Sequence, residues 1–212
     1  MSRRFGLISE YKRKKRHIKQ RLREFRGLCK ASDKVIFAEL CFCLLTPQAK
    51  ALVCDKAIKE LKRKRLLFEG REEDIKPYLR GVRFPNNKAR YLVSARNLFK
   101  NCKGIKIKDK LDIKELFKTR DWLASNVKGL GYKEASHFLR NIGLGRDMAI
   151  LDVHILRNLK ICKVIKKIPP SLNRKAYLDI EEKMRRFSRK VSIPLEDIDL
   201  LFWSSETGFI FK

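Results

Sequence analysis

Within residues 128–154, Lys133 and Asp152 lie nineteen residues apart, each at a predicted helix start. An amine attacks an electrophilic carbon only in its uncharged form, which a helix N-terminus and neighbouring cations favour. Lys133 falls in the first turn of a helix predicted over 133–142, and Lys128 lies shortly before it. The carboxylate of Asp152 can accept the proton of such an amine and stabilise positive charge on a sugar ring. The pair predicts covalent chemistry with an amine nucleophile.

Both residues also have a purely structural explanation. Asp152 precedes VHILRNLK, so it is a good N-cap for the next predicted helix. Lys133 is one of 52 lysine and arginine residues, most of which must be solvated surface charges. His154 lies in the first turn after the aspartate, where it can donate to a phosphate or remain a partly buried polar residue. The residues alone leave these alternatives open.

Two glycines separate the helix that carries the lysine from the helix predicted before it, over 119–127. Gly129 and Gly131 flank Leu130 in a tight turn, which gives the order helix, hairpin, helix. Such a turn exposes backbone N–H groups at the positive end of a helix dipole, where phosphate binds well. An ordinary interhelical turn explains the glycines equally well.

Longer stretches of the sequence give these residues a family context. The run V-x-G-x-G-x-K-x-A-x-x-x-x-x-N, followed after a short loop by L-D-x-H, resembles the signature of the helix–hairpin–helix DNA glycosylase superfamily. GLGYKEASHFLRNIG, AILDVHILR and the ending DLLFWSSETGFIFK resemble its second, mainly archaeal branch of 8-oxoguanine DNA glycosylase/AP lyases. EFRGLCKASDKVIFAELCFCLLT and GVRFPNNKARYLVSARN, with its R-F-x-x-x-K-A-x-Y pattern, are also similar to that branch. The resemblance covers about residues 20–212.

The resemblance implies a role for each residue of the central segment. Lys133 would be the Schiff-base nucleophile, which attacks C1′ of the damaged nucleotide, expels the base and allows β-elimination on the 3′ side. Asp152 would stabilise the oxocarbenium-like transition state and assist the proton transfers. The backbone of Gly129 and Gly131 would hold a phosphate, with a monovalent cation as an optional aid, and His154 would contact another phosphate.

The chain end is implied to read the damaged base. Trp203 and Lys212 would line the base pocket, and His137 falls where some members of the superfamily carry a pocket residue. 8-Oxoguanine differs from guanine by an N7–H donor and a C8 oxygen, so an acceptor near Lys212 would pair with the lesion and leave guanine unsatisfied. The alternative is a frayed tail.

Three further residues would face the strand opposite the lesion. Arg83 and Phe84 match the branch's pair that contacts that strand and wedges into it, which replaces lost stacking around a flipped nucleotide. Phe84 can instead be a loop residue packed on its own domain. Gln48 stands, after Pro47, where this branch more often shows asparagine, and a glutamine there is similar to the endonuclease III-like glycosylases. The preferred opposite base therefore stays open.

The charge of the chain agrees with a nucleic-acid partner. Its 52 basic and 24 acidic residues give a net charge of +28 over 212 residues, so it should bind polyanions in a salt-dependent manner. RNA-binding proteins share such charge, and the basic run 11–26 is either an arm on DNA or a solvated helix face. From the net charge together with the resemblance, we expect a monomer that binds double-stranded DNA containing an oxidised guanine.

The sequence also predicts the cellular location and the cofactor requirement. No apolar run approaches the roughly 20 residues of a membrane helix, and the N-terminus lacks the apolar core of a secretory signal. We therefore expect a cytoplasmic, nucleoid-associated protein without a membrane partner. The six cysteines show no metal-like spacing, so we expect no metal site. We expect no required cofactor and no iron–sulphur cluster, because the four-cysteine cluster usual near the C-terminus of endonuclease III-type enzymes is absent.

The expected fold is all-α, with two helical subdomains flanking a cleft. Helices are predicted near 9–29, 33–45, 48–65, 71–80, 86–100, 111–117, 119–127, 133–142, 152–161, 173–189 and 194–202. Residues 105–111 alternate briefly and could be extended. We expect one catalytic unit, 1–212, divided into a subdomain of residues 31–127 and another of residues 1–30 plus 128–212. The second would carry the helix–hairpin–helix, about 119–142, and the base-pocket tail.

Three functions fit the sequence. The preferred one is a bifunctional DNA glycosylase/AP lyase that excises 8-oxoguanine in base excision repair. The second is an endonuclease III-like glycosylase for oxidised pyrimidines. The third is a non-catalytic helix–hairpin–helix DNA-binding module, in which Lys133 is a surface charge and Asp152 a cap.

Overall fold

Helices build nearly the whole chain in the computed structural model, which describes the backbone of residues 3–212 and side chains from residue 6 onward. The elements are α1 (Arg3–Leu28), α2 (Asp33–Leu45), α3 (Ala51–Arg63), α4 (Leu66–Glu69), α5 (Glu72–Ile75), the 3₁₀ helix η1 (Lys76–Leu79), α6 (Pro85–Phe99), β1 (Lys100–Asn101), β2 (Gly104–Ile105), the 3₁₀ helix η2 (Ile107–Lys110), α7 (Leu116–Asn126), α8 (Tyr132–Asn141), α9 (Val153–Ile161), α10 (Arg174–Val191) and α11 (Leu195–Thr207). The predicted all-α fold is confirmed.

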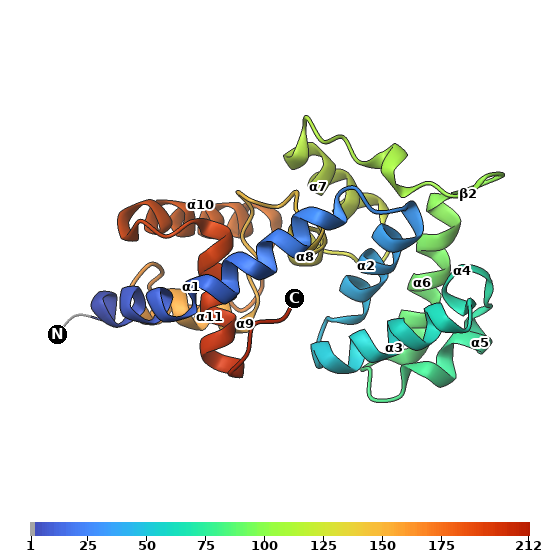
Figure 1. Cartoon of the computed structure of the whole chain (residues 1–212), viewed down its shortest axis with the longest axis horizontal. Coiled ribbons are helices and arrows are strands. Elements are labelled where there is room, and N and C mark those ends of the chain that lie inside the picture. Colours follow the sequence, from blue (N-terminus) through green and yellow to red (C-terminus); the bar gives the residue numbers. More distant parts are fainter. Residues whose placement is uncertain (1–2) are drawn as a thin grey trace.

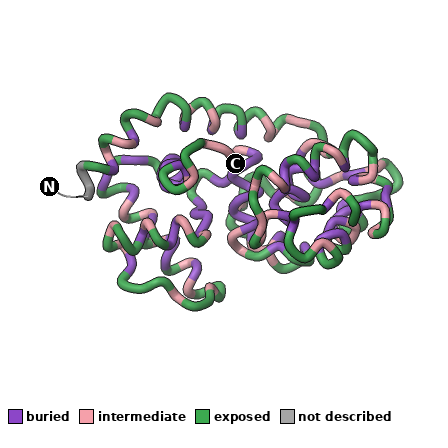
Figure 2. Tube along the Cα trace, turned by 90° about the horizontal axis from the view of Figure 1, so that it is seen from below, coloured by how far each residue is buried: buried purple, intermediate pink, exposed green. Residues whose placement is uncertain are grey.

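Apolar side chains gather in two clusters, which correspond to the two halves of the molecule in Figure 1. One cluster takes its buried residues from α2 to α8, between Ile36 and Met148. The other takes them from α1 and from the chain between Ala149 and Phe202. Figure 2 shows buried residues inside each half and exposed residues on the outer turns. The apolar face of α8 joins the first cluster, although the prediction assigns α8 to the second subdomain. The two apolar clusters do not test the predicted boundary after residue 127, which stays a prediction.

The basic helix α1 links the two halves. Its buried residues recur at helical spacing and form one stripe: Leu7, Tyr11, Ile18, Leu22 and Phe25. The stripe packs on α8 and α11, and Figure 1 shows α1 (blue) running from one half to the other. Most of the lysines and arginines between residues 11 and 26 lie on the other faces of the helix. Whether this face touches DNA stays a prediction.

Between residues 100 and 127 the structure differs from the predicted elements. The helices expected at 111–117 and 119–127 are replaced by one helix, α7, preceded by η2. Of residues 105–111, only Ile105 belongs to a strand, in a hairpin that pairs Lys100 with Ile105 and Asn101 with Gly104. The chain before Lys100 is already helical, so its backbone cannot extend the ladder.

The segment expected as one helix at 71–80 is also divided, into α5 and η1. Pro77 lies in the first turn of η1, where its missing N–H is tolerated although it would interrupt a continuous α-helix. The short helix α4 has no counterpart among the predicted segments. Among the described helices, none is long and apolar enough to cross a membrane.

Candidate active site

A cavity of about 950 Å³ opens between the α2–α3 loop, α8, the start of α9, α11 and the chain end. In Figure 1 the C-terminus lies between the two halves of the molecule. The lining includes seven of the residues singled out in the sequence: Gln48, Lys133, His137, Asp152, His154, Trp203 and Lys212. The other four, Arg83, Phe84, Gly129 and Gly131, lie outside this lining.

The lysine amine enters the cavity from the first turn of α8. Gly131 is the N-cap of this helix and has no side chain to satisfy the first N–H groups, so these stay available to a ligand. The amine of Lys133 forms an ion pair with Glu134, at 2.9 Å from Oε1. An amine attacks only in its uncharged form, so nucleophilic attack requires a proton acceptor. Lys128 is exposed and lies outside the cavity lining.

The aspartate is held by the start of the next helix in the wall. Asp152 is the N-cap of α9, and its Oδ1 accepts a hydrogen bond from the backbone N–H of Ile155 at 2.8 Å. The predicted capping role is therefore confirmed. The cap fixes the side-chain rotamer and uses one carboxylate oxygen, which leaves the other available for chemistry in the cavity.

A buried polar network fixes the backbone three residues before this aspartate. Arg120 of α7 forms a two-pronged ion pair with Glu181 of α10, at 2.6 and 3.0 Å. Glu181 also accepts the backbone N–H of Ala149 at 2.8 Å, and Tyr177 donates to the Ala149 carbonyl at 2.6 Å. Arg120 reaches Ser136 on α8 at 3.2 Å. The network thus ties the approach to the aspartate to the helix that carries the lysine.

The hairpin before α8 requires glycine at one of its two positions. Gly129 has φ +87°, and a Cβ there would lie 2.3 Å from Cδ2 of Tyr91 on α6. Gly131 has φ −89°, which any residue adopts, and its nearest obstacle would be the flexible carboxylate of Glu134 at 3.2 Å. The turn therefore depends on Gly129 for its conformation and for its close packing on α6.

The chain end docks into the wall of the cavity. The Lys212 amine forms ion pairs with Glu39 at 3.1 Å and Asp55 at 2.9 Å, and it lies 4.4 Å from the centre of the Phe42 ring. The carbonyl of Phe211 accepts a hydrogen bond from Arg21 at 2.9 Å. These contacts tie the last two residues to α1, α2 and α3, so the tail is not frayed.

The wall beside the tail is aromatic and contains an uncharged imidazole. Trp203 lies in the part of α11 that extends beyond the predicted helix end at residue 202. Its ring packs edge-on against the Phe209 ring, with 5.2 Å between the ring centres. His137 is buried, with its ring edge-on to Phe42 at 5.8 Å. Burial, together with the nearby cations Arg140 and Lys133, lowers the pKa of His137 well below its ordinary value. This histidine is therefore neutral at physiological pH.

Sequence reasoning missed two further carboxylates in the same lining, those of Glu134 and Asp199. Asp199 of α11 is buried and lies 3.5 Å from the guanidinium of Arg140, which is buried as well. Burial raises the pKa of Asp199 to about 6, Arg140 opposes this rise, and the charge of Asp152 adds to it. No spacing in the sequence relates these residues, because α8 and α11 meet only in the tertiary fold.

Two of the three residues expected to face the opposite strand, Arg83 and Phe84, form an exposed unit beside α6. The Phe84 side chain is 50% exposed, and the Arg83 guanidinium lies 4.8 Å from the centre of its ring. Phe84 is therefore not packed into its own subdomain. Phe84 and Gln48 both adopt left-handed backbone conformations, with φ of 57° and 55°.

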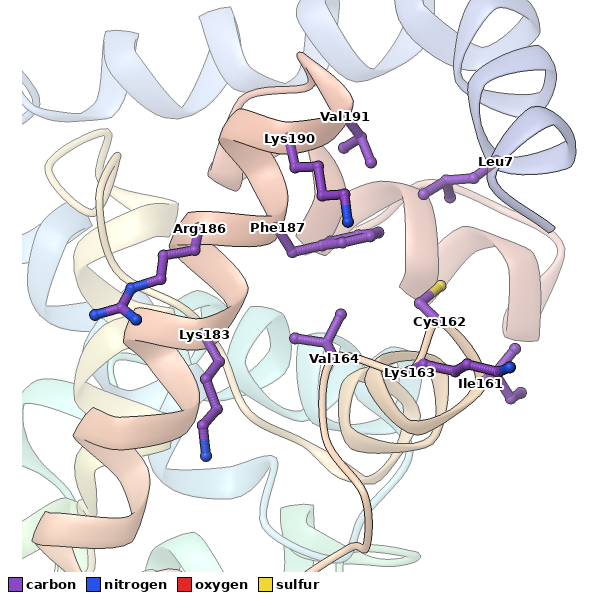
Figure 3. Close-up of a pocket in the computed structure, with 10 residues that line it drawn as sticks. All are labelled: Leu7, Ile161, Cys162, Lys163, Val164, Lys183, Arg186, Phe187, Lys190 and Val191. Carbon is purple, nitrogen blue, oxygen red and sulfur yellow. The ribbon is translucent and has the colours of Figure 1, made fainter. Parts of the chain in front are cut away.

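A second cavity, of about 1060 Å³, lies at the far end of α9 and is shown in Figure 3. Its lining combines apolar side chains such as Leu7 and Phe187 with lysines and an arginine, and it contains no carboxylate or imidazole. Acid–base chemistry is therefore assigned to the first cavity. Among the described residues, no group of three His, Cys, Asp or Glu side chains is arranged to hold a metal ion.

Comparison with known proteins gives this site a family. A family model for 8-oxoguanine DNA glycosylase matches residues 18–193. The 8-oxoguanine DNA glycosylase/AP lyase of Fusobacterium nucleatum is 46% identical over 204 residues, which are 95% of this chain and 94% of that protein. The Methanocaldococcus jannaschii protein of the same name is 40% identical over 199 residues, 92% of this chain and 91% of its own.

Solved structures agree with these relatives. The crystal structure of the Thermotoga maritima 8-oxoguanine DNA glycosylase has a TM-score of 0.87 at 33% identity and covers 99% of this chain and 98% of its own. The M. jannaschii glycosylase/lyase, crystallised with a 15-mer DNA containing 8-oxoguanine, has a TM-score of 0.85 at 35% identity. The match covers 98% of this chain and 100% of that chain. The chain therefore belongs to the helix–hairpin–helix family of 8-oxoguanine DNA glycosylase/AP lyases.

Proposed function

We propose that Lys133 is the nucleophile with which this chain, an 8-oxoguanine DNA glycosylase/AP lyase of base excision repair, releases the oxidised base. The observation that carries the proposal is that its amine and the Asp152 carboxylate line one cavity of about 950 Å³. Enzymes that act on a base in duplex DNA take the nucleotide out of the stack and place it in such a pocket.

The chemistry follows from the amine and the carboxylate. The uncharged amine of Lys133 forms a bond to C1′ while the bond from C1′ to the base nitrogen breaks, and the departing base takes the electron pair and then a proton. The carboxylate of Asp152 stabilises the positive charge that develops on the sugar and accepts the amine proton. Opening of the sugar ring gives an imine, which acidifies the C2′ proton. Loss of that proton expels the 3′ phosphate by β-elimination.

We assign the reading of the base to the wall near the chain end. A backbone oxygen of Lys212 would accept a hydrogen bond from the N7–H of 8-oxoguanine. The ion pairs of the Lys212 amine with Glu39 and Asp55 hold this residue in place. Guanine presents a lone pair at N7, so it would leave two acceptors facing each other. Trp203 offers an aromatic surface for the base. His137, held neutral by burial, would contact the base without adding charge.

Phosphate binding is assigned to the hairpin and the start of α9. The open N-terminus of α8, preceded by Gly129 and Gly131, offers N–H groups at the positive end of a helix dipole. A monovalent cation bound by the hairpin carbonyls would complete this contact. His154 would donate to a second phosphate, and its Nδ1 is buried without a hydrogen-bond partner. The net charge of +28 supports attraction to duplex DNA.

Recognition of the opposite strand is assigned to Gln48, Arg83 and Phe84. The exposed Phe84 ring would wedge between bases, Arg83 would contact the strand, and Gln48 would fill the gap left by the flipped nucleotide. A monomer has all these residues in one chain, so we propose that it works as a monomer. We also propose that it associates with the nucleoid, where its DNA substrate lies.

Borohydride trapping tests the proposal, because borohydride reduces the imine to a stable amine. Wild-type protein should form a covalent adduct with duplex DNA carrying one 8-oxoguanine, and Lys133→Gln should form none. Lys118→Gln, which removes an exposed lysine of α7, is the matched control and should trap normally. Asp152→Asn should slow turnover by orders of magnitude while DNA affinity holds. An undiminished adduct in Lys133→Gln would refute the assignment.

A further inference from the structure

We propose that Lys88 is a positioning residue, which holds the gap-filling loop of Gln48 at a fixed spacing from the wedge residue Phe84. The inference rests on the proposed function, because it concerns the loops assigned to the opposite strand. Lys88 belongs to α6, lies outside the lining of the reactive cavity, and is only 4% exposed.

The contacts of Lys88 join the two loops directly. Its ammonium donates to the carbonyls of Leu45 at 2.5 Å and Pro47 at 2.7 Å, at the end of α2 and in the loop that follows. Its backbone N–H donates to the carbonyl of Phe84 at 3.0 Å. One residue therefore bonds the loop before Gln48 on one side and the wedge residue on the other.

Both positioned residues have backbones that need external support. Gln48 and Phe84 have φ of 55° and 57°, a conformation that is unfavourable for side chains other than glycine and persists only where the surroundings impose it. The carbonyls at the end of α2 lack intrahelical partners and lie at the negative end of its dipole. A buried ammonium satisfies two of the carbonyls in this region, which an apolar side chain of the same size cannot do.

The face of α6 that carries Lys88 meets a third element. Lys88 and Tyr91 are three residues apart within α6, so they lie on one face, and Phe84 is the N-cap of the same helix. Tyr91 packs against Gly129, where a Cβ would come within 2.3 Å of its ring. α6 thus aligns the wedge, the gap-filling loop and the hairpin, and α2 and α6 lie close together. This arrangement gives the R-F-x-x-x-K-A-x-Y segment a physical role.

Coupling between Lys88 and Gln48 separates positioning from general stabilisation. We would measure single-turnover excision of 8-oxoguanine opposite cytosine for wild type, Lys88→Met, Gln48→Ala and the double variant. Lys88→Met should slow excision about tenfold in the wild-type background and less than about twofold once the Gln48 side chain is absent, because interacting residues are not additive. Arg90→Met removes an exposed charge from α6 and is the matched control.

The outcomes are distinct. Equal losses from Lys88→Met in both backgrounds, or no loss in either, would overturn the inference. An inactive wild type would instead refute the proposed function. Lys88→Gln, which keeps one N–H donor group, should give an intermediate rate at a thermal midpoint near that of wild type, and it provides the comparison if Lys88→Met folds poorly. A Lys88→Gln rate equal to wild type would also contradict the role.

Discussion

The hairpin offers the sharpest test of the structural reasoning, because its two glycines differ in what they tolerate. In Gly129→Ala the new Cβ must adopt φ +87° and would lie 2.3 Å from the Tyr91 ring. A left-handed backbone costs about 1–2 kcal/mol for a residue with a Cβ. Forcing a packed ring aside costs about 1–3 kcal/mol. In Gly131→Ala, φ is ordinary and the nearest obstacle is the flexible Glu134 side chain.

The expected loss of stability for Gly129→Ala is therefore about 3 kcal/mol, which lowers the Tm of a protein of this size by roughly 6–12 °C. Gly131→Ala should lower the Tm by only roughly 2–4 °C, because its one cost, about 1 kcal/mol, is that alanine is a poorer N-cap than glycine. Differential scanning calorimetry or thermal circular dichroism measures both values. The same samples provide DNA affinity, so that an effect on the fold is not mistaken for one on phosphate contact.

A third variant separates the two costs at Gly129. In a Tyr91→Ala background the clash disappears, and only the backbone cost of about 1–2 kcal/mol should remain for Gly129→Ala. Equal destabilisation by Gly129→Ala and Gly131→Ala would refute the assigned hairpin geometry. An undiminished cost in the Tyr91→Ala background would refute the contact with α6.

Three other predictions concern groups around the cavity. Because the pKa of Asp199 rises from 3.8 to about 6 in the folded protein, the native state binds a proton that the unfolded chain has already released, and stability should fall as pH rises through that window. Asp199→Asn should remove this slope in urea unfolding between pH 4 and 7. Arg120→Met should destabilise the protein by about 3 kcal/mol, since the buried Glu181 loses its two-pronged partner and keeps only the longer ion pair with Arg185 at 3.5 Å. A urea midpoint equal to wild type would contradict this. Deleting Lys212 should reduce the ratio of excision of 8-oxoguanine to that of guanine, and wild-type selectivity would show that the tail does not read the base.

The sequence predicted most of the helices because each requires only a local pattern. Apolar residues at helical spacing identify α1, α8 and α10, and glycine or proline marks their ends. The prediction was wrong where a helix end depends on distant packing: η2 and α7 replace two expected helices. The extent of α11 is another example, since the turn that carries Trp203 continues the helix beyond the predicted end.

The candidate site divides in the same way. Lys133 and Asp152 could be proposed from the sequence because a glycine turn, a first-turn lysine and an N-cap are features of a few consecutive residues. Asp199 gave no such signal, because its ion pair is with Arg140, which is far away in the chain. Glu134 contacts its neighbour Lys133, but only the fold places it in the cavity wall. Lys88 stands in a quoted pattern, but its hydrogen bonds to Leu45 and Pro47 cannot be read from that pattern.

The sequence by itself determined the family and the helical class and predicted the proposed reactive pair, since conformational preference and motif spacing are local properties. Only the tertiary structure decided that helices from both halves enclose one cavity, that the chain end is anchored by Glu39 and Asp55, and that Lys88 joins two distant loops. These features depend on which surfaces meet when the apolar faces are buried together. No pattern within one segment encodes that outcome.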